Sequence, residues 1–118
     1  MLLGVWQQYS MKLDGEDPPA GISQVDTWEF KEDTVGRPES PFGTWNFDPT
    51  RSPKHFQFQL FDKGPRLGLY ELEGDHLTLC YGTDEGRRPS TIKAGYGTVL
   101  LKFRRDTNFP NQASDPIR

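Results

Sequence analysis

Strict alternation of apolar and polar residues is the feature that most constrains the fold of this chain. In HFQFQLF (residues 55–61), Phe56, Phe58 and Leu60 fall on one face and polar residues fall on the other, which is typical of a half-buried strand. The segment TVLLKFRR (98–105) repeats the pattern near the C-terminus. No window keeps an apolar period of 3.6 residues over three turns, so we expect at most one short helical turn.

A hairpin is predicted over Leu67–Gly82, where two alternating runs flank the sequence EGD. Tyr70 lies on the apolar face of the first run, and Tyr81 lies on the apolar face of the second. Gly74 and Asp75 between them tolerate the positive φ that short hairpin turns need. The two runs are therefore expected to pair as antiparallel neighbours.

Further short strands are predicted at residues 5–13, 26–31 and 43–48. In the first of them, most apolar residues share one parity, but Trp6 stands alone on the other. The spacers DGEDPPAG, GRPESP, DPTRSPK, DKGPR and TDEGRRPS are rich in Pro and Gly and are interpreted as turns. We therefore predict an all-β fold of seven to nine short antiparallel strands, as a barrel or a sandwich; a closed barrel would leave no exposed strand edges.

Length, charge and cysteine content limit the remaining possibilities. The 118 residues suit one domain, which we place at residues 1–105, followed by a polar tail or linker at 106–118 that is expected to be disordered. The net charge of −3 contains no block of like charge, so the pattern of a nucleic-acid binder is missing. No apolar run is long enough to span a membrane, and the start MLLGVW is too short and too uncharged for a signal peptide. The lone Cys80 cannot form an internal disulfide, and the cellular compartment stays undecided.

The segments LLGVW, GTWNFDPTRSPK, LGLYELEGDHLTLCYG, RRPSTIKAGYG and VLLKFRR occur in this order, and the resemblance that they carry covers Leu3–Arg105. Together they resemble an uncharacterised lipocalin-like domain family found mainly in planctomycete bacteria. The resemblance implies a small calycin-type barrel and no established reaction. Members of that family often follow an export signal. Where they tend to carry an aliphatic residue and an acid after the Pro-Lys turn, this chain has His55 and Phe56.

Lipocalin-like barrels share a Gly-x-Trp in the first strand and an Arg in the last strand. Gly4 and Trp6 fit the first position, and Arg104 or Arg105 fits the second. A guanidinium over an indole face gains about 0.5–2 kcal/mol. Because Arg105 shares parity with the apolar residues of its strand, we predict that Arg105 lies on Trp6 and that the pair plugs one end of the barrel.

The His, Cys and Glu residues that could bind a metal ion or act in catalysis are not spaced in a way that indicates either kind of site. His76 and Cys80 lie about 13 Å apart along one strand, too far for one metal ion, and His55 adds no spaced set of ligands. Cys80 has no helix N-terminus to lower its pKa. Glu71 and Glu73 are spaced as glycosidase carboxylates can be, but alternating acids are typical of a solvated outer face. We predict no catalytic residues, no metal and no cofactor.

The aromatic residues of separate strands are expected to converge inside the barrel. The chain is predicted to be a non-enzymatic module that binds a small apolar or amphipathic ligand, or a protein partner, at the open end. The alternative is a hydrolase or carbohydrate-active protein that uses carboxylates beside an aromatic platform. The oligomeric state stays open. The residues predicted to bind the ligand are Trp28, Trp45, Phe56, Phe58, Tyr70 and Tyr81.

Overall fold

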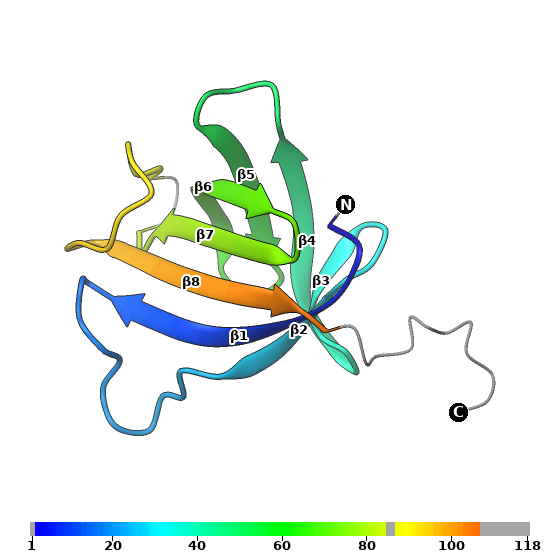
Figure 1. The fold of residues 1–118 in the computed structure, drawn as a ribbon, viewed down its shortest axis with the longest axis horizontal. Helices are drawn as coiled ribbons and strands as arrows, with labels where there is room; N and C mark the ends of the chain where they lie inside the picture. The colour runs from blue at the N-terminus through cyan, green and yellow to red at the C-terminus, as the bar shows by residue number, and fades with distance from the viewer. Residues whose placement is uncertain (1, 85–86, 107–118) are drawn as a thin grey trace.

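The computed structural model describes residues 2–84 and 87–106, and the regular elements in these ranges are all strands. The eight strands are β1 (Gly4–Leu13), β2 (Asp26–Phe30), β3 (Thr34–Arg37), β4 (Ser40–Asp48), β5 (Lys54–Leu60), β6 (Gly64–Glu73), β7 (His76–Gly82) and β8 (Thr98–Arg105). Each strand pairs antiparallel with the next one, and β8 pairs with β1 to close a barrel (Figure 1). The predicted all-β fold of seven to nine antiparallel strands is therefore confirmed. None of the described residues forms a helix able to cross a membrane.

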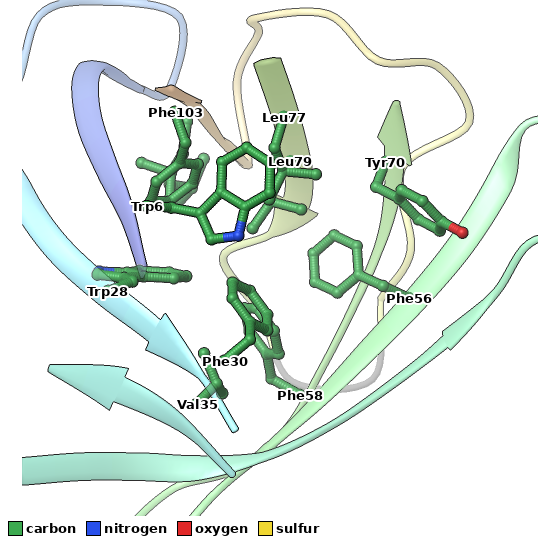
Figure 2. Close-up of a cluster of buried hydrophobic side chains, with 12 residues drawn as sticks. Trp6, Trp28, Phe30, Val35, Phe56, Phe58, Tyr70, Leu77, Leu79 and Phe103 are labelled. Atoms are coloured by element: carbon green, nitrogen blue, oxygen red, sulfur yellow. The ribbon is translucent and has the colours of Figure 1, made fainter. Parts of the chain in front are cut away.

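Large rings from different strands fill the barrel. Figure 2 shows Trp6, Trp28, Phe30 and Phe58 directed into one shared interior, together with Leu77 and other apolar side chains. The rings of Trp28 and Phe58 meet edge to face with centroids 5.8 Å apart. Such tilted contacts between aromatic rings add to the stabilisation from burial alone. The apolar side chains on one face of each strand form this core. This is why the alternation of apolar and polar residues in the sequence predicts the fold.

The connection between β7 and β8 covers part of the outer surface. Leu69 and Cys80 belong to the outward parity of their strands, yet both are buried. The Sγ atom of Cys80 lies 3.7 Å from the carbonyl oxygens of Thr91 and Lys93. Arg88 of the same connection donates hydrogen bonds of 3.1 Å to two backbone carbonyls of β5 and β6. These contacts hold the connection against the outside of the barrel.

A β-bulge in β1 explains the odd parity of Trp6. The pairing of β1 with β8 shifts register between Gln8 and Ser10. Before the shift Trp6 and Gln8 are the buried residues, and after it Met11 packs against the core. A bulge inserts one residue and so moves the inward positions of a strand to the other parity. The buried Gln8 amide donates to the carbonyl of Gln24 at 2.9 Å.

Strand β3 lies where the sequence pattern predicts a turn. Gly36 and Arg37 are the first two residues of the spacer GRPESP, but both belong to β3. The last two residues of the spacer, Ser40 and Pro41, belong to β4. A Cβ atom on Gly36 would lie 2.4 Å from the Cα of Pro41, so the two strands approach closely there. The interpretation of this spacer as a turn alone is wrong, because only residues 38–39 separate the two strands.

The predicted hairpin over Leu67–Gly82 is present, with β6 and β7 joined at residues 74–75. Gly74 adopts a φ of 60°, and Asp75 is not among the residues with positive φ. The predicted tail at 106–118 lies outside the described residues apart from Asp106, whose backbone N–H donates to the carbonyl of Val5 at 2.9 Å.

Candidate ligand-binding site at the open end of the barrel

The connections between successive strands alternate between the two ends of the barrel. The β2–β3, β4–β5 and β6–β7 connections lie at the end where β1 starts and β8 finishes, here called the closed end. The other four connections lie at the opposite end, here called the open end. Any site at the open end is therefore built from the last residues of β1, β3, β5 and β7 and the first residues of their partners.

Trp6 and Arg105 lie in contact at the closed end. The Trp6 side chain is completely buried, and its indole N–H donates to the carbonyl of Leu2 at 3.0 Å. The guanidinium carbon of Arg105 lies 4.2 Å from the centre of the Trp6 ring. Nη1 of Arg105 also donates to the carbonyl of Leu3 at 3.1 Å. The cation therefore covers the indole face and ties it to the N-terminal segment.

Two further contacts distinguish Arg104 from Arg105 at the end of β8. Nε of Arg105 lies 3.5 Å from the carboxylate of Asp75, in the β6–β7 turn. Arg104 instead points outward and lies 5.2 Å from the ring centre of the exposed Tyr9. Parity within β8 therefore separates the two arginines as the alternation of the strand requires.

A cavity of about 420 Å³ lies at the open end. Its size falls within the range of small-molecule sites, toward the lower limit. The lining residues come from six strands and two connections, so the cavity is part of the barrel and does not belong to one loop. They are Trp28, Phe42, Phe58, Leu60, Asp62, Lys63, Arg66, Tyr81, Thr83 and Val99.

The apolar part of the cavity is held by ring-to-ring contacts. The ring of Trp28 meets the ring of Phe42 edge to face with centroids 5.0 Å apart, and it meets the ring of Phe58 in the same way at 5.8 Å. The ring of Tyr81 lies 6.1 Å from that of Phe58, at an interplanar angle of 66°. Because these rings support one another, the floor of the cavity is preformed.

Polar groups occupy the mouth. Asp62 and Lys63 lie in the β5–β6 turn, and Arg66 follows in β6. Two cations against one acid give this side of the cavity a positive charge. Removal of the Tyr81 hydroxyl from water raises its pKa to about 12, an effect that the positive charge of Arg66 partly opposes. At neutral pH the hydroxyl is therefore protonated and can donate a hydrogen bond.

The structure brings three of the six predicted ligand-binding residues together at the cavity: Trp28, Phe58 and Tyr81. The other three point toward the interior but lie outside the cavity lining, so the six do not form one site. Phe56 is buried between rings, with Phe47 stacked at 5.3 Å.

Trp45 and Tyr70 lie toward the closed end. The indole N–H of Trp45 donates to the carbonyl of Lys31 in the β2–β3 connection at 2.9 Å. Tyr70 is buried near the β4–β5 connection, and desolvation raises its pKa. Both residues therefore support the fold, and neither lines the cavity.

Sequence reasoning missed several residues of the cavity. Leu60 and Val99 are on the apolar parity of predicted strands, and their places at the strand ends could have located them at the mouth. Arg66 was missed because the spacer DKGPR was interpreted as a turn, whereas β6 already begins at Gly64 within it. Phe42 precedes the first residue of a predicted strand and gave no signal.

The groups considered for catalysis lie away from this cavity. Glu71 and Glu73 are exposed on the outer face of β6. Burial raises the pKa of the Cys80 thiol and so favours its unreactive form. His76 is exposed at the start of β7, next to the closed end. Among residues 2–84 and 87–106, no three His, Cys, Asp or Glu side chains are grouped to hold a metal ion.

Comparison of the chain with protein-family models, with curated proteins and with solved structures gave no match.

Proposed function

We propose that this barrel is a non-enzymatic binding module that takes a small apolar or amphipathic ligand into the cavity at its open end. The observation that carries the proposal is the cavity of about 420 Å³ with an aromatic floor and a charged mouth. Concave, mainly apolar sites with a few polar groups at one side are the usual form of small-molecule sites.

The packing of the barrel supports an open-end site over a site in the centre. Rings fill the centre, and the indole–guanidinium contact covers the closed end. At the open end, Leu60 and Tyr81 keep part of their surface exposed, so a ligand there would remove apolar area from water. Each Å² of apolar surface removed contributes about 25 cal/mol.

The test uses a neutral apolar dye, N-phenyl-1-naphthylamine, whose fluorescence rises in apolar sites. Saturable binding by the purified protein is expected. Leu60→Trp should fill the cavity and lower the affinity at least tenfold. The matched control is Leu67→Trp, which adds the same bulk outside the cavity lining and should leave binding unchanged. Absence of saturable binding, or equal binding by both variants, would reject the proposal.

Membership of the lipocalin-like family is part of the same proposal, supported by the closed eight-stranded meander and by the contact of Arg105 with Trp6. A protein partner at the same mouth stays the alternative occupant. The hydrolase or carbohydrate-active alternative stays a prediction; Glu71 and Glu73 are exposed on the outer face of β6 and do not line the open-end cavity.

A further inference from the structure

Arg66 is an arginine on the inward face of a barrel whose interior is mainly apolar. In β6 it shares parity with Gly68 and the buried Tyr70, and its partner across the sheet is Phe58. It is half-buried and lines the open-end cavity. The inward parity of a barrel strand normally carries apolar residues, so a cation at this position needs a specific explanation.

No acidic side chain among the described residues forms an ion pair with Arg66. Its guanidinium donates to the carbonyl of its own neighbour Pro65 at 3.2 Å, through Nη1. Asp62 lines the same cavity, but no ion pair joins it to Arg66 within 4.0 Å. The remaining N–H groups of the guanidinium are thus available at the cavity.

Tyr81 supplies a second donor beside this cation. Its partner across the β6–β7 ladder is Gly68, two residues from Arg66 on the same face, so Tyr81 and Arg66 are diagonal neighbours. No hydrogen bond to the Tyr81 hydroxyl occurs among the described residues. A phenol that stays protonated at neutral pH donates to an anion but gives a cation only a weak acceptor.

We propose that the ligand of the open-end cavity is an anionic amphiphile, whose headgroup binds the Arg66 guanidinium and the Tyr81 hydroxyl while its apolar part covers Trp28 and Phe58. This inference rests on the function proposed above and adds the chemical class of the ligand. The planar fork of an arginine matches the two oxygens of a carboxylate, and sulfonates and phosphates offer the same oxygens. Lys63 at the mouth adds a second positive charge for the headgroup.

The test compares probes with the same ten-carbon chain, below their micelle concentrations, by displacement of the neutral dye. Decanoate is expected to bind at least tenfold more tightly than decanol, and decanesulfonate tests whether the headgroup must be a carboxylate. Arg66→Met should weaken decanoate about ten- to hundredfold and leave decanol unchanged, since charge-assisted hydrogen bonds have this magnitude. Tyr81→Phe should weaken decanoate by a smaller factor.

Two controls separate the role of Arg66 from general effects. Arg87→Met removes an exposed arginine outside the cavity and should change neither affinity. Arg66→Lys keeps the charge without the planar fork and should give an intermediate affinity for decanoate. It serves in place of Arg66→Met if that variant does not fold.

The outcomes distinguish this inference from the proposed function. If decanoate and decanol bind equally and Arg66→Met weakens neither, the anionic class is wrong while the apolar cavity stands. If the dye and all three probes fail to bind, the proposed function fails and this inference fails with it.

Discussion

Replacement of Arg105 by methionine tests the contact that covers the closed end. Methionine keeps the unbranched apolar chain but removes the cation over Trp6 and the donor to the Leu3 carbonyl. The cation–π contact contributes about 1–2 kcal/mol on a buried ring, and a charge-assisted hydrogen bond about 1.5–3 kcal/mol. The ion pair with Asp75 adds little, because that side chain is 62% exposed. With partial compensation by the methionine side chain, we expect a loss of about 2–3 kcal/mol in the free energy of unfolding.

The assay is urea unfolding followed by circular dichroism, with Arg104→Met as the matched control. Arg104 is the next residue of β8, but it lies over the exposed Tyr9 on the outer face, so its replacement should cost no more than about 0.5 kcal/mol. Arg105→Lys should recover part of the loss. Equal unfolding free energies for the two methionine variants would refute the reasoning, because the closed end would then gain nothing from the cation.

Three further predictions concern single groups. Burial raises the pKa of Tyr81 to about 12 and also raises the pKa of Tyr70, so an ultraviolet absorbance titration should show tyrosine ionisation above pH 10. Tyr81→Phe should remove the part near pH 12 and leave the contribution of Tyr70, and an unchanged titration of the variant would contradict the assignment. Gly68→Ala should destabilise the protein by about 1–3 kcal/mol, since its Cβ would lie 2.5 Å from the Phe56 ring, whereas Gly95→Ala meets open space; equal melting temperatures would exclude the predicted clash. Partial desolvation and two nearby arginines lower the pKa of His55, so the folded state binds this proton less readily than the unfolded state, and stability should fall as the pH drops below about 6.5. His55→Gln should reduce the difference in urea midpoint between pH 7.5 and pH 5, and an unchanged difference would count against this cause.

The sequence was sufficient to predict every strand except β3, and it was much less informative about breaks in the strand pattern. Alternation in residues 55–61 and 98–105 predicts β5 and β8 because each has one face in the core. It failed at β3, a four-residue strand that ends in Gly36 and Arg37 and is followed directly by Pro38, because this sequence looks like a turn. It also could not show that a bulge near Gln8 moves the inward parity of β1, because that shift depends on the register with β8.

The candidate site was predicted in part, for a geometrical reason. Parity shows whether a ring points inward, but it does not show how far along the barrel axis the ring lies. Trp28, Phe58 and Tyr81 reach the cavity, whereas Trp45 and Tyr70 have the same inward parity and lie near the closed end. That distance depends on the stagger between neighbouring strands, which is a property of the pairing between them.

The pairing of β1 with β8 places the first and last strands of the barrel side by side, with Gly4 and Arg105 at the same end (Figure 1). A short peptide could therefore join these two points, and new termini could be opened at the β4–β5 connection to give a circular permutant with the same strand neighbours. A fluorescent protein or an affinity tag fused directly after Asp106 would extend from the closed end. The cavity would then face away from the attachment point, which suits immobilisation of the protein on a sensor surface.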